Sequence, residues 1–307
     1  MNWVVFAIVA VTAIALEYFI DNYITDVYYK GRGAPAQKCF FVLPQIVVGI
    51  LMIIIFGVDF TAVEPVAFLA FFGSGLIISV ANIFFYKAFE IDDSTNVGIF
   101  VQSTPVFYLI FGWLFLNETI SPLQLVAFLI VLSASALIIL ATRKKSRRMK
   151  MRTAFYILLF VIFEVIGNVM FVKASSENLS FLTEIGFVFI GKGIGNGIIV
   201  LLKPKWRRRY RSIVKSSKKK VLVPLSCSFI VNVVAETTYR AALVLAPSVA
   251  LASVISDSAV PIAVFFMGIV FTLIWPKFGR EKLDRKSVIV HLVATILVVV
   301  GIILIQV

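Results

Sequence analysis

Long apolar runs fill most of the chain, and short polar stretches separate them. Ten runs reach about 20 residues, the length that a helix needs to cross a bilayer. In lipid every backbone N–H and C=O must be paired within its own segment, so we expect each run to be helical. The predicted spans are residues 3–22, 36–57, 65–87, 95–116, 121–142, 153–173, 179–202, 221–244, 248–274 and 286–306. The pattern predicts an all-α integral membrane protein with ten transmembrane helices.

The second half of the chain repeats features of the first half. The matching positions are Glu17 and Glu164, Asp21 and Asn168, Tyr86 and Tyr239, Lys87 and Arg240, and Pro105 and Pro261. Each half holds five spans, an odd number, so the second copy must enter the membrane from the opposite side. We therefore predict two inverted five-helix repeats, an arrangement typical of secondary transporters. Their predicted bounds are residues 1–142 and 153–307, with a basic connecting loop at residues 143–152.

Basic residues fall almost entirely in the loops after odd-numbered spans. The longest basic runs lie at residues 143–152 and 203–220, and the net charge is +13. Because cytoplasmic loops carry an excess of Lys and Arg, the pattern places these loops in the cytoplasm and both termini outside. We expect a multi-pass protein of the plasma membrane whose basic loops contact anionic lipid. A soluble partner is the alternative for these loops, and their position between spans argues against nucleic acid.

Composition removes several classes of function. Among 307 residues, 61% are hydrophobic, and the sequence holds one histidine and two cysteines, which are His291, Cys39 and Cys227. A metal site needs three or four ligands close together, so we expect no metal and no cofactor. The serine-hydrolase, P-loop and zinc-protease signatures are absent from the sequence, so we expect no enzyme. The first apolar run has no cleavage site before Glu17, and we interpret it as a retained helix.

Ionisable and amide side chains inside the spans are the functional candidates. A charge at the bilayer centre costs about 2.5–3.5 kcal/mol on insertion scales, so such residues normally face a partner or a water-filled cavity. The predicted substrate-binding residues are Glu17, Tyr86, Gln102, Glu164, Asn168, Asn232, Glu236, Tyr239, Arg240, Ser256 and Asp257. Carboxylates outnumber bases here, which favours a substrate with a positive group, such as an amino acid or an amine. Buried carboxylic acids also exchange protons near neutral pH, so protons are a further candidate ligand.

Two spans carry patterns with more than one interpretation. In the eighth span Asn232, Glu236 and Arg240 recur every four residues and form one stripe. This stripe either lines a binding site or only forms an internal salt bridge. In the seventh span, glycine occupies every second position of residues 191–197, which predicts close helix packing.

Two prolines at matching positions are candidate gating points. A proline inside a helix removes one hydrogen bond and clashes with the carbonyl four residues before it. Pro261 would therefore free the carbonyl of Asp257, and Pro105 would loosen its span beside Gln102 and Ser103. Matching breaks in two repeats point to a transporter's binding site, and a static kink is the alternative.

Short motifs give the chain a family resemblance. The third span ends in Tyr-Lys-Ala (86–88), the fourth contains Pro-Val-Phe (105–107), and Leu-Asn-Glu (116–118) precedes the fifth. In the second half Tyr239-Arg240-Ala241 and Val260-Pro261 correspond. In these motifs the chain resembles the EamA-type transporters of the drug/metabolite transporter superfamily.

The resemblance implies a central cavity lined by the first, third, fourth, sixth, eighth and ninth helices, with the fifth and tenth at the periphery. Members of the family usually have cytoplasmic termini, which is opposite to the orientation that the charges predict.

These observations favour a secondary active transporter that moves a small polar metabolite by alternating access. The sequence has no ATP-binding motif, so uphill transport would draw on an ion gradient. The alternatives are a flippase for a lipid-linked sugar, a membrane-embedded enzyme, and a scaffold whose basic loops recruit a soluble partner. An enzyme would need a catalytic cluster at one membrane face, whereas the polar residues are spread over both halves.

Overall fold

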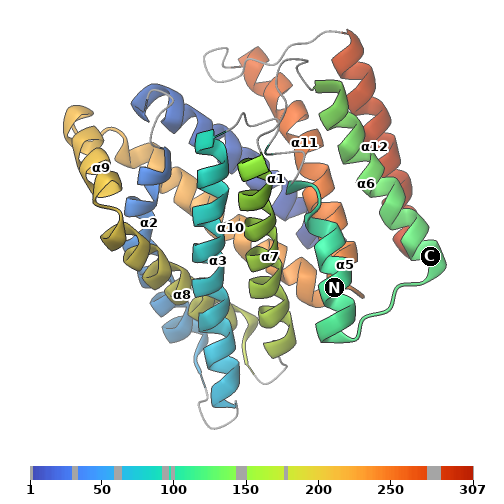
Figure 1. Cartoon of the computed structure of the whole chain (residues 1–307), viewed down its shortest axis with the longest axis horizontal. Coiled ribbons are helices and arrows are strands. Elements are labelled where there is room, and N and C mark those ends of the chain that lie inside the picture. Colours follow the sequence, from blue (N-terminus) through green and yellow to red (C-terminus); the bar gives the residue numbers. More distant parts are fainter. Residues whose placement is uncertain are drawn as a thin grey trace.

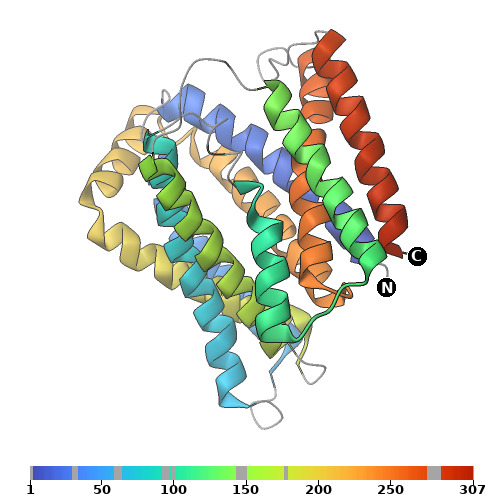
Figure 2. The same ribbon diagram turned by 45° about the vertical axis from the view of Figure 1, so that its right-hand side comes forward.

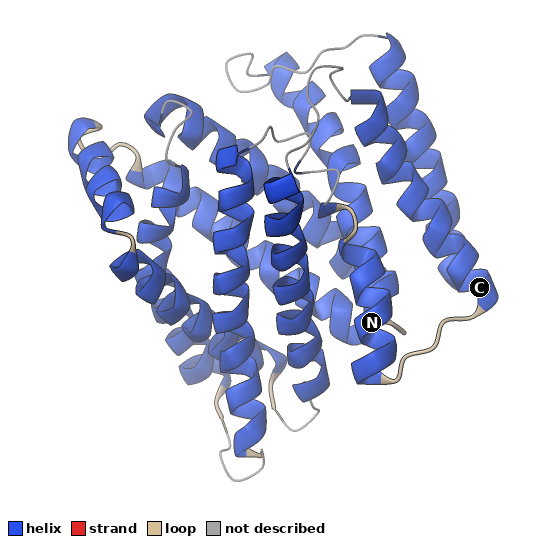
Figure 3. Ribbon diagram, in the orientation of Figure 1, coloured by secondary structure: helices blue, strands red, loops and turns tan. Residues whose placement is uncertain are grey.

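The computed structural model describes residues 3–29, 34–58, 64–91, 97, 101–142, 151–175, 179–274 and 285–306, and the regular structure within them is helical throughout (Figure 1, Figure 3). A π-helical turn, η1 (Thr25–Tyr29), extends the first helix, and a 3₁₀ turn, η2 (Ala34–Gln37), precedes the second. The α-helices are α1 (Trp3–Ile24), α2 (Lys38–Phe56), α3 (Pro65–Ile91), α5 (Thr104–Leu116), α6 (Pro122–Thr142), α7 (Met151–Ala174), α8 (Phe181–Leu202), α9 (Pro204–Ser216), α10 (Leu222–Leu245), α11 (Val249–Ile274) and α12 (Arg285–Gln306). The predicted all-α class is confirmed.

The apolar helices agree with the predicted spans. Within the described residues, eight helices are long and apolar enough to cross a membrane. Two shorter apolar helices, Thr104–Leu116 and Pro122–Ile138, bring the number to the ten predicted. Most helix ends fall within a few residues of the prediction, because the length of an apolar run is set by the thickness of the bilayer.

The fourth predicted span differs from its prediction. Residues 95–116 were expected to form one helix with Pro105 inside it, but Gln102 and Ser103 form a turn and α5 begins at Thr104. Pro105 therefore lies in the first turn of α5. N–H groups in the first turn of a helix have no partner within the helix, so the missing N–H of proline breaks no hydrogen bond there. The expected kink at Pro105 is wrong for this reason, whereas Pro261 does lie inside α11. Residues 92–96 and 98–100 lie outside the described part of the chain.

The closest helix pairs join the first half of the chain to the second half. Among the described residues, α1 packs mainly on α10, α2 on α8, α3 on α7, and α6 on α12. The α6–α12 pair lies at one edge of the bundle in both views, as the resemblance implies for the fifth and tenth spans (Figure 1, Figure 2). The predicted connecting loop 143–152 lies outside the described residues except at positions 151 and 152, so the division into two repeats remains a prediction.

Glycines allow α8 to lie against two neighbouring helices at once. A Cβ atom at Gly191 would meet the backbone of Phe72 in α3, and one at Gly75 would meet the backbone of α8 at Val188 and Lys192. On the other side of α8, a Cβ at Gly49 of α2 would meet the backbone of Gly186. Small residues permit such backbone contact between membrane helices. The close packing predicted from the glycine spacing is confirmed.

Candidate functional site

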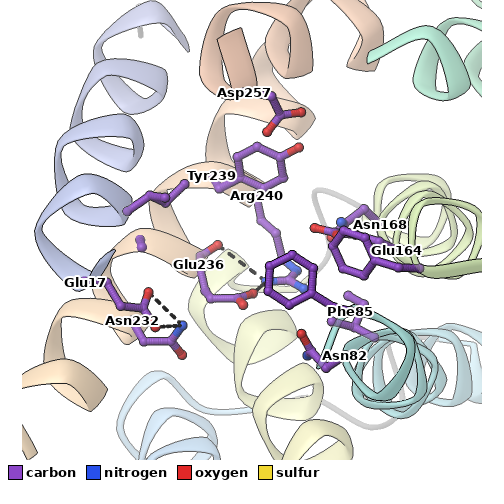
Figure 4. A pocket seen from close by; sticks show the side chains of 14 residues that line it. Glu17, Asn82, Phe85, Glu164, Asn168, Asn232, Glu236, Tyr239, Arg240 and Asp257 are labelled. Atoms are coloured by element: carbon purple, nitrogen blue, oxygen red, sulfur yellow. Dashed lines mark hydrogen bonds and ion pairs between the residues drawn. The ribbon is translucent and has the colours of Figure 1, made fainter. Parts of the chain in front are cut away.

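A cavity of about 270 Å³ lies between α1, α3, α7, α10 and α11 (Figure 4). These are the first, third, sixth, eighth and ninth apolar helices, which are five of the six that the resemblance implies. The fourth, α5, has no residue in the described lining. The predicted residues that line it are Glu17, Glu164, Asn168, Asn232, Glu236, Tyr239, Arg240 and Asp257. Both halves of the chain therefore contribute to the same cavity.

The α7 side of the cavity presents one carboxylate and one amide. Glu164 and Asn168 lie one helical turn apart, so they project from the same face. The Asn168 Nδ2 group donates a hydrogen bond of 2.8 Å to the hydroxyl of Tyr108 on α5. Glu164 forms no hydrogen bond or ion pair with the described residues. Glu164 is half-buried and faces the cavity, and a carboxylate without a partner inside a membrane-spanning bundle is unfavourable, so this position suits a cationic ligand or a proton.

The stripe on α10 holds a cluster of charges. Glu236 forms ion pairs with Arg240 on its own helix and with Lys192 of α8. The predicted internal salt bridge is therefore present, and a second cation extends it. The Arg240 guanidinium is buried and lies 5.6 Å from the centre of the Phe171 ring. Its Nε has no hydrogen-bond partner within the described residues. Arg240 thus keeps one buried donor that no described residue uses.

Hydrogen bonds also connect α1 to α10. Asn232 donates through Nδ2 to both carboxylate oxygens of Glu17, at 3.0 and 3.2 Å. One turn further, Ser228 donates to Asp21 at 2.6 Å, and Gln37 donates to the same carboxylate at 2.9 Å. Glu17 lines the cavity, whereas Asp21 belongs to the α1–α10 contact beyond it.

The break at Pro261 has the predicted local effect. The carbonyl of Asp257, four residues earlier, accepts a long hydrogen bond of 3.4 Å from Gln102 Nε2. Gln102 lies in the turn before α5, so a side chain from the first half compensates the interrupted helix in the second. The Asp257 carboxylate faces the cavity and accepts a hydrogen bond of 2.6 Å from Ser253.

Three predicted residues lie outside the described cavity lining, namely Tyr86, Gln102 and Ser256. Tyr86 is turned away because successive helical residues differ by about 100°, so its neighbour Phe85 takes the cavity position. The ring of Tyr86 instead lies 5.5 Å from the ammonium of Lys38. Ser256 is fully buried within α11.

Sequence reasoning missed two contributions to the cavity. Asn82 lines the cavity one turn before Phe85 on α3. Its amide side chain lies inside an apolar span, and this could have identified it as a candidate from the sequence. Lys192 does not line the cavity, but it pairs with the lining residue Glu236; it was expected to be a buried base of the seventh span, and its partner on another helix gave no signal in the sequence.

The charges of the lining are mainly negative. Four carboxylates face the cavity, namely Glu17, Glu164, Glu236 and Asp257. Of these, Glu236 alone forms ion pairs within the described residues, with Arg240 and Lys192. Like the whole described chain, the cavity contains no group of three or more His, Cys, Asp or Glu side chains placed to hold a metal. The arrangement is suited to bind an organic cation.

Comparison with known proteins gives one family and one fold. Residues 1–140 match the EamA-like transporter family. No curated protein matches the sequence. A solved crystal structure, among 26 matching chains, superposes with a TM-score of 0.64 and 12% sequence identity, covering 98% of this chain and 94% of that one. At this identity the likeness shows the fold alone.

Proposed function

Residues 1–140 belong to the EamA-like transporter family within the drug/metabolite transporter superfamily, and from this premise we propose a specific activity for this integral multi-pass membrane protein. It is a secondary active transporter for a small metabolite with a positive group, an amino acid or an amine. The metabolite binds in the cavity between the two halves and crosses by alternating access. The substrate, the coupling and the mechanism are all part of the proposal.

The observation that carries the proposal is the unpaired Glu164. Its carboxylate faces a cavity in which the other acids have hydrogen-bond or ion-pair partners. An ammonium group of the substrate supplies the missing partner and so gains a charge-assisted hydrogen bond. A cavity of about 270 Å³ lies near the lower end of the volumes of small-molecule pockets, which suits a small metabolite.

An amino acid fits the cavity better than a simple amine does. Arg240 lines the same cavity, and its buried Nε has no hydrogen-bond partner within the described residues. Guanidinium groups bind carboxylates through paired N–H donors. Both charged groups of an amino acid therefore meet a side chain of opposite charge. Glu164 would bind the ammonium group, and Arg240 would bind the carboxylate.

The placement of the cavity supports alternating access. Its walls come from both halves, and the main packed pairs also join the two halves. A rocking motion of one half against the other opens the cavity first to one side and then to the other. The sequence offers no ATP-binding motif, so an ion gradient drives uphill transport, with the cavity carboxylates as the proton carriers.

Counterflow in proteoliposomes tests this proposal. Vesicles preloaded with one candidate are assayed for uptake of the same labelled compound from a panel of amino acids, amines and nucleotide sugars. We expect exchange of amino acids or amines and none of nucleotide sugars. Exchange of nucleotide sugars alone, or of no compound in the panel, would contradict the proposal.

A further inference from the structure

The segment after α8 forms an amphipathic helix that the transport cavity does not use. In α9 the apolar residues recur at positions i, i+4, i+7 and i+8, which places them on one face. These residues are Trp206, Tyr210, Ile213 and Val214. They pack with Ile24 and Tyr29 at the end of α1 and with Val221 and Leu225 at the start of α10. One face of α9 is therefore fixed to the bundle.

The opposite face of α9 is basic and exposed. Arg208, Arg211 and Lys215 lie at positions i, i+3 and i+7, so they form one line on the helix surface. All three are exposed, and none forms an ion pair within the described residues. The helix has no acidic residue. Arg209 differs from these three, because it donates a hydrogen bond of 3.1 Å to the carbonyl of Tyr29 and anchors the helix.

The position of α9 decides what this basic face meets. In both views α9 lies at the outer edge of the bundle, on the side of α2 and α8 and opposite the α6–α12 pair (Figure 1, Figure 2). Its basic line points away from the protein, since the apolar face packs inward. Around a membrane-spanning bundle, the surroundings at the end of a span are lipid headgroups. Trp206 and Tyr210 are also of the residue types that gather at this level.

We propose that Arg208, Arg211 and Lys215 form a binding surface for anionic lipid headgroups. This site is separate from the transport cavity and does not depend on the proposed substrate. Each basic residue close to an anionic surface contributes roughly a five-fold gain in binding, so the three together favour an anionic over a neutral headgroup on the order of 100-fold. Because α9 packs on the ends of α1 and α10, bound lipid would hold these ends in place.

Quenching of Trp206 fluorescence by brominated lipids tests the site in the full-length protein. Trp206 is made the single tryptophan by Trp3→Phe, Trp113→Phe and Trp275→Phe. The protein is reconstituted into vesicles of phosphatidylcholine with a minority of phosphatidylglycerol. In one preparation phosphatidylglycerol carries the bromine, and in the other an equal amount of phosphatidylcholine carries it. The two surfaces then have the same charge, and only the labelled lipid differs.

We expect brominated phosphatidylglycerol to quench Trp206 more strongly than brominated phosphatidylcholine. Replacing Arg208, Arg211 and Lys215 by Gln should remove this difference. The matched control replaces Lys218, Lys219 and Lys220 by Gln, which removes the same charge from the turn after α9 and should leave the difference intact.

Three outcomes would overturn the proposal. Equal quenching by the two lipids when Arg208, Arg211 and Lys215 are intact would show that the basic face does not select anionic lipid. A soluble acidic partner would then be the remaining candidate for this face. Equal loss in both triple variants would assign the effect to net charge rather than to this face. Loss of the preference in excess inorganic phosphate, compared with chloride at the same ionic strength, would identify a free phosphate site.

Discussion

At the scale of single residues, two glutamates of the same cavity are in opposite situations. Glu236 is held by Lys192 and Arg240, whereas Glu164 has no hydrogen bond or ion pair within the described residues. Removing the charge of a paired group leaves its partners uncompensated. Removing an unpaired charge from inside a membrane-spanning bundle removes an unfavourable group instead. Transport and stability should therefore respond differently at these two positions.

Glu164→Gln is expected to abolish counterflow while the melting temperature in detergent stays the same or rises. The amide keeps the shape of the side chain and one acceptor oxygen, but it has no negative charge to form an ion pair with a substrate ammonium group. Glu64→Gln is the matched control, because Glu64 is exposed before α3 and outside the cavity lining. Wild-type counterflow of the Glu164 variant at equal expression would remove this residue from the binding site.

Glu236→Gln is expected to destabilise the protein by about 3–5 kcal/mol, since Lys192 and Arg240 would be left buried without their shared counter-ion. The measurement is a melting curve in detergent beside that of Glu164→Gln. If both variants melt at the same temperature, the ion pairs do not contribute to stability in this way.

Glu118 gives a further prediction at this scale. Its carboxylate accepts hydrogen bonds from the Val249 N–H at 3.0 and 3.1 Å and from the Ser248 hydroxyl at 2.8 Å, so it caps the N-terminus of α11. Glu118→Ala should cost about 0.5–2 kcal/mol, the usual range for a lost N-cap. Thermal unfolding measures the cost, and Glu118→Gln, which keeps one acceptor oxygen, should lose less. An unchanged melting temperature in Glu118→Ala would exclude the capping role.

The sequence predicts candidate residues better than it predicts their partners. The stripe of Asn232, Glu236 and Arg240 follows from helical spacing, and all three line the cavity. The pairing of Glu236 with Lys192 requires two helices to meet, which spacing within one helix does not encode. Tyr86 was predicted to line the cavity, but Phe85 does so instead. Neighbouring residues of a helix point about 100° apart, so an error of one position selects the wrong side chain.

At the scale of helices, the length of the apolar runs predicts the membrane spans, but it predicts neither a break within a span nor a helix outside the spans. The fourth span was predicted as one continuous helix, because the turn that interrupts it at Gln102 and Ser103 lies within an apolar run. The helix α9 was taken as a loop because its charges dominate its composition, although Trp206, Tyr210 and Ile213 recur at helical spacing.

Gly75→Ala and Gly191→Ala should each destabilise the protein. The added Cβ would meet backbone atoms of the facing helix, which cannot move aside without separating α3 from α8. Overpacking of this kind typically costs about 1–3 kcal/mol. In the control Gly73→Ala the new Cβ would meet only the flexible end of Met170, at 3.1 Å, so its melting temperature should stay near wild type. Equal melting temperatures for all three variants would contradict the packing argument.

Pro261→Ala is expected to slow exchange and to keep or raise stability. It restores a helical N–H to the carbonyl of Asp257, which now accepts its hydrogen bond from Gln102. Proline in a helix interior costs about 3 kcal/mol relative to alanine, unless the surroundings have adapted to it. Pro105→Ala serves as the control, since Pro105 lies in the first turn of α5. Equal turnover in the two variants would show that the break in α11 does not act as a gate.

At the scale of the whole molecule, the orientation in the membrane is the main prediction. With Cys39 and Cys227 replaced by Ser, the positive-inside rule predicts that a cysteine at Ser217, after α9, is protected from an impermeant thiol reagent in intact cells. A cysteine at Ser121, in the exposed segment between α5 and α6, should be labelled. The opposite pattern would place the termini in the cytoplasm.

The pairing of first-half helices with second-half helices also has a consequence for biosynthesis. The ribosome delivers α1, α2 and α3 to the membrane before their main partners α10, α8 and α7 have been made. Glu17 and Asp21 therefore enter the membrane without their hydrogen-bond partners. Those partners, Asn232 and Ser228, are synthesised more than two hundred residues later. Chains stalled on the ribosome after α6 should be inserted yet easily digested by protease, and resistance should appear once α10 has entered the membrane.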